Sequence, residues 1–227
     1  PRACRICGDP VFPACREYAR IPVCAPCLAL PRRLNPPRCI ICGRPLISEI
    51  DTCTICRDRS YPFSEHRSLY EYRGSVKELI RLYKFSQVRG LAVFFADRFA
   101  EELHARVFRG EEYVLVPVPG NPASLGKRGW DQIKLISKYL ARKHGFAAAE
   151  LLRRGRSKTQ KSLGFDSRTK NLKGKLRVAG GVGAAGVPPD IILLDDVFTT
   201  GSTAAECTRV LLEAGAERVR VPTLAID

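Results

Sequence analysis

Two adjacent aspartates, Asp195 and Asp196, stand at the end of an aliphatic run, and a turn of small hydroxyl-bearing residues follows them. The chain reads IILLDDVFTTGST over residues 191–203. A buried strand needs no acids at its end, so we expect the pair to bind something. Carboxylates accept hydrogen bonds from sugar hydroxyls, and backbone amides at the start of a helix can surround a phosphate. Together the two features indicate a ligand with both groups, such as a ribose that carries a 5′-phosphate.

The aliphatic residues Ile191 to Leu194 are expected to form a buried strand, with the two acids at its carboxyl end. In open parallel sheets, ligands bind outside the carboxyl ends of the strands, where the next helix begins. A glycine in the turn lets the backbone approach the phosphate closely, and the hydroxyl groups add hydrogen-bond donors. The residues expected to surround the phosphate are Thr199, Thr200, Gly201, Ser202 and Thr203.

Cysteines dominate the other end of the chain. Nine of the ten lie in the first 56 residues, and eight of these form four Cys-x-x-Cys pairs. The pairs are Cys4/Cys7, Cys24/Cys27, Cys39/Cys42 and Cys53/Cys56. Each such turn points two thiolates at one ion, and two turns complete a tetrahedral zinc site. Residues 1–60 contain few apolar runs, so we predict that two structural Zn²⁺ ions replace the missing core.

The Cys-rich segment is also duplicated. CRICGDP at residues 4–10 and CIICGRP at residues 39–45 are near copies, and a second Cys-x-x-Cys pair follows each. The favoured arrangement is sequential, with the first two pairs on one ion and the last two on the other. An interleaved cross-brace uses the same ligands and stays open at this point. Disulfides are disfavoured because the N-terminal sequence PRACRICGDP has no hydrophobic secretory core.

The charge of the chain points to polyanionic partners. Its 227 residues include 38 Lys and Arg against 23 Asp and Glu, a formal net charge of +15. This excess favours partners such as nucleic acid or phosphate esters. No apolar run approaches the ~18 residues that a membrane span requires. We therefore expect a cytoplasmic protein without membrane insertion.

The organisation of the chain predicts an α/β fold with a parallel sheet and a small zinc-binding domain before it. Residues 1–60 form the predicted Cys-rich domain, and residues 61–227 the α/β domain. Helical periodicity is seen over residues 74–85 and 90–108, and a strand is expected over 112–120 with a helix after it. The acidic strand, a helix and a closing strand at 218–226 complete the pattern, and strand–helix–strand order favours right-handed parallel units.

Several of these motifs resemble those of one known family. LLDDVFTTGST is similar to the motif with which type I phosphoribosyltransferases bind phosphoribosyl pyrophosphate (PRPP). The chain as a whole resembles the ComF family, the competence-associated ComFC/GntX group. The resemblance covers the Cys-rich start, YRGSVKELIRLYKF, VPVPGNPASLGKRGWDQ, RSKTQKSLGFDSRTKN and the PRPP motif, in this order. It implies a Rossmann-like phosphoribosyltransferase domain behind a zinc module.

The resemblance also implies roles for basic residues. The pyrophosphate loop of the family corresponds to residues 118–128, with Lys127 and Arg128 as PRPP-binding cations. The flexible loop that closes over PRPP corresponds to residues 156–171, where the cationic and amide side chains expected to meet the pyrophosphate are Arg156, Lys158, Gln160, Lys161 and Arg168. The implied catalytic residues are Asp195, Asp196, Arg156 and Lys158. Mg²⁺ is expected mainly on oxygens of PRPP itself.

Two functions follow as alternatives from different classes. The first is a Mg²⁺-dependent phosphoribosyltransferase, a glycosyltransferase whose acceptor the sequence does not identify. The second is a non-catalytic factor that binds single-stranded DNA during natural transformation and uses the PRPP site as scaffold or sensor. The basic segment between residues 153 and 177, with ten Lys or Arg and one acid, favours DNA contact. PRPP, single-stranded DNA and other competence proteins are the expected partners.

Overall fold

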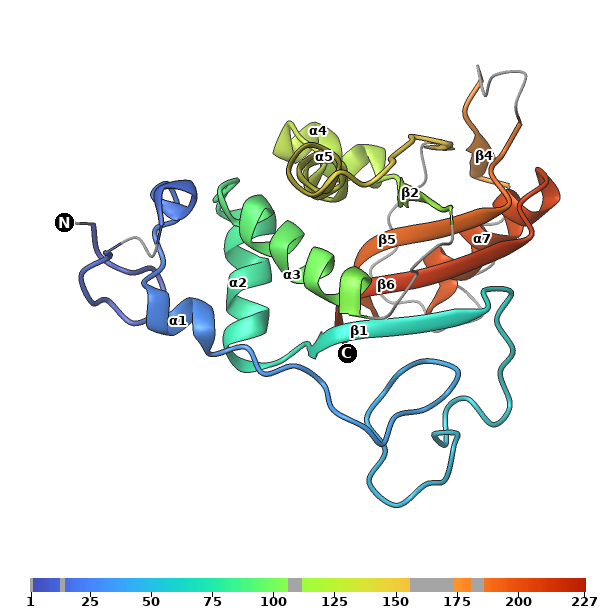
Figure 1. Ribbon diagram of the computed structural model, residues 1–227, viewed down its shortest axis with the longest axis horizontal. Helices are drawn as coiled ribbons and strands as arrows, with labels where there is room; N and C mark the ends of the chain where they lie inside the picture. Colours follow the sequence, from blue (N-terminus) through green and yellow to red (C-terminus); the bar gives the residue numbers. More distant parts are fainter. Residues whose placement is uncertain (1, 13–14, 106–111, 156–173, 181–185) are drawn as a thin grey trace.

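The computed structural model describes residues 2–12, 15–105, 112–155, 174–180 and 186–227 (Figure 1). In chain order its elements are η1 (Arg16–Tyr18), α1 (Ala25–Ala29), β1 (Glu65–Glu71), α2 (Gly74–Phe85), α3 (Leu91–Ala105), β2 (Val114–Pro117), α4 (Pro122–Arg128), α5 (Gln132–His144), β3 (Leu152–Arg154), β4 (Leu176–Val178), β5 (Asp190–Phe198), α7 (Ser202–Glu213) and β6 (Arg218–Ile226).

The centre of the fold is a four-stranded sheet in the order β1-β6-β5-β2, and all three of its strand pairs are parallel. The prediction of a parallel α/β sheet is therefore confirmed. Within it, β5 lies between β2 and β6, and Ile191 is the register partner of both Val114 and Val219. A second, two-stranded sheet pairs β3 with β4 in antiparallel fashion.

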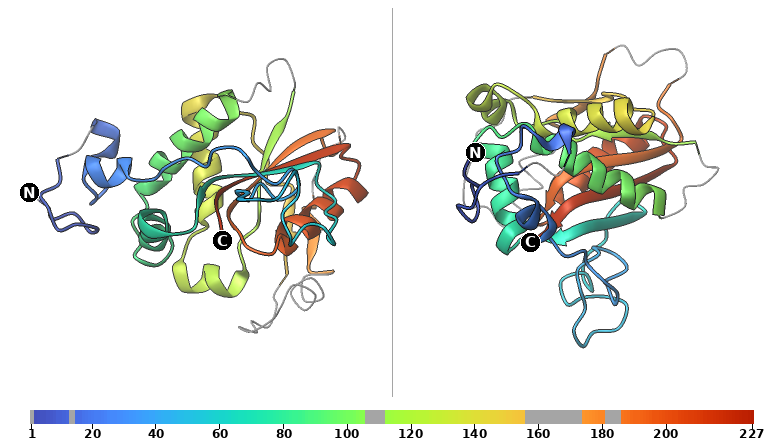
Figure 2. Two further views of the ribbon diagram at one scale, coloured as in Figure 1. Left: turned by 90° about the horizontal axis from the view of Figure 1, so that it is seen from below. Right: turned by 60° about the vertical axis from the view of Figure 1, so that its left-hand side comes forward.

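Helices cover both faces of the sheet (Figure 2). Ile192 and Leu194 of β5 belong to the core shared with α2, α3 and α5, whereas Ile191 and Leu193 pack in the core shared with α7. This alternation follows from the period of two residues in a strand. The helices that follow β2 and β5 thus lie on opposite faces.

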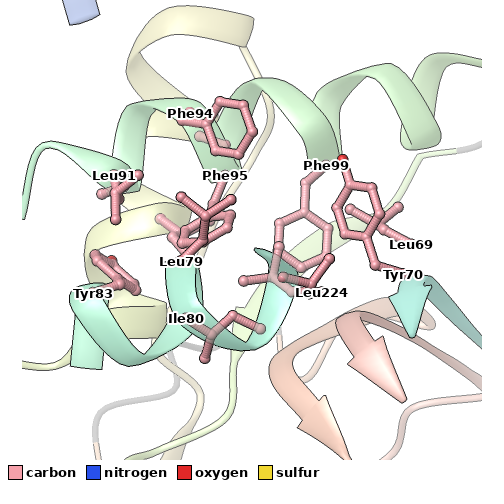
Figure 3. Packing of buried hydrophobic residues seen from close by; sticks show 14 of the residues in the cluster. Leu69, Tyr70, Leu79, Ile80, Tyr83, Leu91, Phe94, Phe95, Phe99 and Leu224 are labelled. Carbon is pink, nitrogen blue, oxygen red and sulfur yellow. The ribbon is translucent and has the colours of Figure 1, made fainter. Parts of the chain in front are cut away.

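The larger core lies under α2 and α3. Figure 3 shows Leu79, Ile80 and Tyr83 of α2 next to Phe95 and Phe99 of α3, and all five are at most 2% exposed. The rings of Tyr83 and Phe95 meet edge to face with centroids 5.3 Å apart. This packing fixes the carboxyl-terminal end of α2, which matters for the site described below.

The Cys-rich segment contacts the α/β domain at two separate places (Figure 1). Ile21, Val23 and Leu28 join the core of α2 and α3, and Leu46 joins the core on the α7 side. Between these places the chain crosses α3, where Arg33 forms ion pairs of 2.9 Å with Glu101 and with Glu102. That residues 1–60 form a domain of their own stays a prediction.

Strand β1 and helix α4 differ from the sequence expectations. Strand β1 was not predicted because Glu65–Glu71 carries polar residues at buried positions, namely His66 and Ser68, each 1% exposed. Part of the loop predicted over residues 118–128 is the helix α4, which begins at Pro122 with Asn121 as its cap. Within the described residues, no helix combines the length and apolar character that a membrane crossing needs.

Candidate functional site

The candidate site lies where β2 ends beside β5. The register pairs Pro117 with Leu194, and the amide of Val118 still donates to the carbonyl oxygen of Leu194 at 2.9 Å. The prediction that the strand ends at Leu194 is wrong, because β5 continues along β6 to Phe198. The two acids nevertheless lie beyond the end of β2. Since the helices after β2 and β5 cover opposite faces, this is the switch point at which parallel sheets bind ligands.

Asp196 faces the helices α2 and α5 and is 8% exposed. Its Oδ1 lies 2.8 Å from Nζ of Lys84, and its Oδ2 accepts a hydrogen bond of 2.9 Å from Nε2 of Gln132. Lys84 is in the last turn of α2, and Gln132 is the first residue of α5. The carboxylate therefore joins three elements that are remote in the sequence.

Asp195 faces the side of the sheet that α7 covers, and it is half-buried. Burial and the neighbouring charge of Asp196 raise the pKa of Asp195 to about 7, although Lys84 and Arg154 act in the opposite direction. Burial also acts to raise the pKa of Asp196, but the Lys84 ammonium and the Gln132 amide outweigh it and hold that pKa below its usual value. The pair thus carries close to one full negative charge below neutral pH, most of it on Asp196.

The predicted phosphate turn leads directly into α7. Gly201 is its N-cap residue with a left-handed φ of +76°. The hydroxyl oxygens of Thr200 and Ser202 are 2.9 Å apart, and the amide of Ser202 points at the Thr200 hydroxyl at 3.4 Å. Thr199 is exposed, Thr200 and Thr203 are half-buried, and Ser202 is buried. A helix start presents backbone amides that can donate to an anion, and the turn leads into such a start at α7.

The predicted phosphate turn packs against an aromatic cluster of Tyr61, Phe63, His66 and Phe198. The hydroxyl of Tyr61 donates a hydrogen bond of 3.0 Å to the carbonyl oxygen of Thr200. The Tyr61 ring stacks on Phe63 and meets Phe198 edge to face, with centroids 4.9 and 6.0 Å apart. Phe198 in turn stacks on His66 at 3.8 Å. The turn therefore rests on residues that directly follow the second Cys-rich repeat.

Of the two predicted pyrophosphate cations, Arg128 is connected to the acids through Gln132. Arg128 is half-buried, and its Nη1 donates to Oε1 of Gln132, the residue that also contacts Asp196. Lys127 is exposed. Asp131 caps α5 and accepts a hydrogen bond of 3.2 Å from the amide of Gly120, which ties the loop to the helix. The PRPP-binding roles of Lys127 and Arg128 stay predictions.

The predicted closing loop falls outside the described residues. This applies to Arg156, Lys158, Gln160, Lys161 and Arg168. Arg154, just before this loop at the end of β3, was not predicted as a site residue. Its charge acts on Asp195, and its Nε is buried without a hydrogen-bond partner. It is a further cation on the α7 side of the site.

Sequence reasoning also missed Lys84, Gln132 and Tyr61. A lysine in the last turn of a helix is common because it complements the helix dipole, so Lys84 gave no distinct signal. Gln132 and Tyr61 stand out even less. Gln132 in WDQ and Lys84 in YKF do lie in stretches that carry the ComF resemblance, but Tyr61 does not. Only the spatial arrangement shows that these residues meet Asp196 and Thr200.

The eight predicted zinc ligands form two groups, Cys4, Cys7, Cys24 and Cys27 in one and Cys39, Cys42, Cys53 and Cys56 in the other. Within each group the sulfur atoms all lie within 4.8 Å of one another. The sequential grouping is therefore confirmed, and the interleaved alternative is wrong. Four thiols at this spacing fit a tetrahedral zinc site.

The two groups repeat the same backbone turn. Gly8 and Gly43 both have positive φ values, +88° and +66°, and each donates its amide to the carbonyl of the first cysteine of its repeat at 2.9 Å. In the first group, the amides of Ile6 and Cys24 point at Sγ of Cys4 at 3.5 and 3.3 Å. Amide donors of this kind stabilise a thiolate, the form that binds metal.

His66 anchors the second repeat to the sheet. Its Nδ1 lies 2.6 Å from the carbonyl oxygen of Cys42, and its Nε2 lies 3.1 Å from Oγ1 of Thr223 on β6. Burial lowers the pKa of His66 to about 3, so the ring is neutral at physiological pH. The second Cys group is thus connected through His66 and Phe198 to the phosphate turn.

Comparisons with known proteins agree with the motifs. No protein-family model matches the chain. The competence protein ComFC of Bacillus subtilis (strain 168) is 27% identical over 204 residues, 85% of this chain and 79% of ComFC. The DNA utilization protein YhgH of Escherichia coli (strain K12) is 29% identical over 226 residues, 97% of this chain and 95% of YhgH. The chain is a homologue of ComFC and YhgH. The resemblance to the ComF family is thereby confirmed, and it includes the Cys-rich segment.

A second ComFC, from Streptococcus pneumoniae, is 28% identical over 207 residues, 89% of this chain and 86% of that protein. Similar solved structures include a hypoxanthine phosphoribosyltransferase from Staphylococcus aureus, with a TM-score of 0.37 and 11% identity over 61% of this chain and 65% of that one. An allosteric regulatory enzyme of purine biosynthesis has a TM-score of 0.38 and 22% identity, over 60% of this chain and 26% of that one.

Proposed function

We propose that this ComFC/YhgH homologue binds PRPP together with Mg²⁺ at the carboxyl end of β5 and acts as a phosphoribosyltransferase-like protein in DNA uptake or utilization. One observation carries the proposal: two adjacent acids and a hydroxyl-rich turn lie where β2 stops beside β5, at the start of α7. This arrangement matches the two halves of a ribose phosphate. The carboxylates accept from the ribose hydroxyls, and the turn and helix start donate to the 5′-phosphate.

The basic side chains suit the chemistry of the leaving group. Cleavage of the anomeric C–O bond of PRPP builds negative charge on departing pyrophosphate, so cations must surround it. Arg128 donates to Gln132, which contacts Asp196, and the charge of Arg154 acts on Asp195. In the sequence, Arg154 comes just before the loop predicted to close over PRPP. Mg²⁺, when bound through oxygens of PRPP, would neutralise part of this charge. Because both oxygens of Asp196 already have protein partners, the chain itself offers little direct ligation of the ion.

The two Cys groups are proposed to hold one structural Zn²⁺ each. The second ion would fix the repeat that carries Cys42 and, through it, His66 and the residues below the phosphate turn. In this role zinc supplies no chemistry to the reaction. It replaces the hydrophobic core that residues 1–60 are too short and too polar to form.

Contact with single-stranded DNA is a second candidate function, and the β3–β4 hairpin favours it. Arg153 and Arg177 are register partners on this hairpin, and both are exposed. Lys175 adds a third basic residue. A DNA utilization protein is among the relatives, and a basic surface next to a basic segment suits a phosphate backbone. The two functions are compatible.

The PRPP proposal is tested with the variant Asp195→Asn plus Asp196→Asn. PRPP binding in the presence of Mg²⁺ should be lost, while circular dichroism and the melting temperature show a folded domain. Unchanged PRPP affinity in this folded variant would contradict the proposal. If the unmodified protein binds PRPP and the variant does not, the next step is to test nucleobases, amines and DNA ends as acceptors of the phosphoribosyl group, with pyrophosphate release as the readout.

A further inference from the structure

The Asp196 carboxylate is already held by protein side chains on both of its oxygens. Lys84 approaches Oδ1 at 2.8 Å and Gln132 donates to Oδ2 at 2.9 Å. The side chain of Lys84 is 16% exposed and that of Asp196 11% exposed. A carboxylate has about four acceptor positions. Lys84, Gln132 and the Val197 amide all act on this one, so about one position remains for a ligand.

The partners of Asp196 are themselves fixed. Tyr83, the residue before Lys84, is fully buried, and its hydroxyl donates a hydrogen bond of 2.6 Å to the carbonyl oxygen of Gln132. Two consecutive residues of α2 thus reach the first residue of α5, one directly and one through Asp196. Gln132 also accepts a hydrogen bond from Arg128, the last residue of α4.

Stability alone gives a poor reason for such an ion pair. Removing two charges from water costs free energy that their attraction often fails to repay, and apolar substitutes are frequently as stable. The pair lies at the carboxyl end of β5, next to Asp195 and beyond the end of β2. A charge at this place acts on whatever the two acids bind.

We propose that Lys84 is a positioning residue of the ribose-phosphate site, which fixes the orientation and ionisation of Asp196 and links it through Gln132 to Arg128. The inference rests on the proposed function, because it assigns Lys84 to the same PRPP site. Lys84 does not contact the reacting atoms in this account. It holds Asp196 in one orientation, with the remaining acceptor position available to a ribose hydroxyl, and it partly neutralises the acidic pair for an anionic ligand.

The test compares PRPP affinity in the presence of Mg²⁺ for the unmodified protein, Lys84→Met and Lys84→Arg. Arg81→Met is the matched control, because Arg81 lies on the same helix and pairs at 2.9 Å with Glu78 on its exposed face. We expect Lys84→Met to weaken PRPP binding at least about tenfold, since truncating one partner leaves the buried carboxylate unpaired. Lys84→Arg should recover part of the loss, and Arg81→Met should bind as the unmodified protein does.

A pH profile separates positioning from a merely structural role. The charged or titratable groups around Asp195 are Asp196 on its own strand, Lys84 from α2, Arg154 from β3 and Cys207 from α7. Lys84 lowers the pKa of Asp195, so its removal should move the midpoint of pH-dependent PRPP binding upward. Lys84→Arg keeps the charge, so it should leave the pH midpoint of PRPP binding unchanged. If Lys84→Met does not fold, Lys84→Arg is the variant to measure.

Two results would overturn the inference while the proposed function stands. One is PRPP binding by folded Lys84→Met with unchanged affinity. The other is weaker binding by Lys84→Met with an unmoved pH midpoint, which would mark Lys84 as a structural residue. If the unmodified protein itself fails to bind PRPP, the proposed function fails and this inference falls with it.

Discussion

Tyr61 lies directly against Gly201. A Cβ atom at Gly201 would come within 2.6 Å of Cε1 of Tyr61 and 2.6 Å of Cζ of Phe198, and φ of this glycine is +76°. The Tyr61 hydroxyl also donates to the Thr200 carbonyl oxygen at 3.0 Å. The predicted phosphate turn is therefore shaped by Tyr61, which directly follows the Cys-rich segment, and by Phe198 of β5.

Gly201→Ala tests this contact through stability. A side chain in the left-handed region costs of order 1–3 kcal/mol, and the clash with two rings adds to it. We expect the free energy of unfolding in denaturant to fall by at least that amount. Gly126→Ala is the control, because a Cβ there meets nothing within 4 Å and α4 should tolerate alanine. Equal stabilities of the two variants would contradict the packing described here.

The raised pKa of Asp195 predicts how PRPP binding depends on pH. A protonated carboxyl accepts fewer hydrogen bonds from ribose hydroxyls, so affinity should increase as the pH rises through about 7. Asp195→Asn should bind more weakly and lose this component of the pH dependence. PRPP titrates in the same range, and its own contribution is common to both proteins. Identical pH profiles for the two proteins would show that Asp195 does not contact the ligand.

The raised pKa of Asp195 also determines how the free energy of unfolding depends on pH. The pKa of Asp195 is about 7 in the folded protein against a usual value of 3.8, so the folded state binds this proton more tightly. The contribution of Asp195 to the free energy of unfolding therefore falls as the pH rises from about 4 to about 7. Asp196 acts oppositely, because its pKa is lowered: its contribution is lost as the pH falls through that lowered pKa.

Paired substitutions test the metal grouping. Cys4→Ser plus Cys27→Ser disrupts one group and should remove one Zn²⁺ per chain, whereas Cys4→Ser plus Cys39→Ser disrupts both groups and should remove two. Elemental analysis of purified protein measures the difference. Loss of a single ion from the second variant would indicate ligands shared between the repeats, and absence of zinc from the unmodified protein would contradict the site.

The DNA-binding function predicts a salt dependence. Logarithmic affinity for a single strand falls with logarithmic salt concentration by about 0.7 for each phosphate contact. Arg153→Gln plus Arg177→Gln should therefore weaken oligonucleotide binding and reduce the slope by about 1.4 if both arginines contact phosphates. Arg81→Gln, on the exposed face of α2, is the control. An affinity that salt does not change would remove this function.

Much of the fold could be predicted from local patterns. The aliphatic run before Asp195, the helix after it and the closing strand are strongly periodic, and the structure has them as β5, α7 and β6. Spacing identified the eight cysteines and favoured the sequential grouping, but only the structure decides between it and the interleaved alternative. Strand β1 could not be predicted in this way, because its buried His66 and Ser68 are satisfied by hydrogen bonds to Cys42 and Thr223 that exist only in the assembled fold.

The candidate site was predicted in part. The acids and the turn are contiguous in the sequence, so their chemistry can be read directly. Lys84 and Gln132 contact Asp196 from α2 and α5. No sequence pattern predicts a contact between side chains that are so far apart in the chain. Nothing in the sequence distinguishes the buried His66 from His104 and His144, which lie in the last turns of α3 and α5.

PRPP binding is measured most directly by calorimetric titration of zinc-loaded protein, with and without Mg²⁺. We expect saturable binding at one site per chain that is much tighter with Mg²⁺ and absent from the Asp195→Asn plus Asp196→Asn variant. If folded, zinc-loaded protein gives no heat of binding under either condition, the protein does not bind PRPP, and the basic surface around Arg153 and Arg177 becomes the candidate for function.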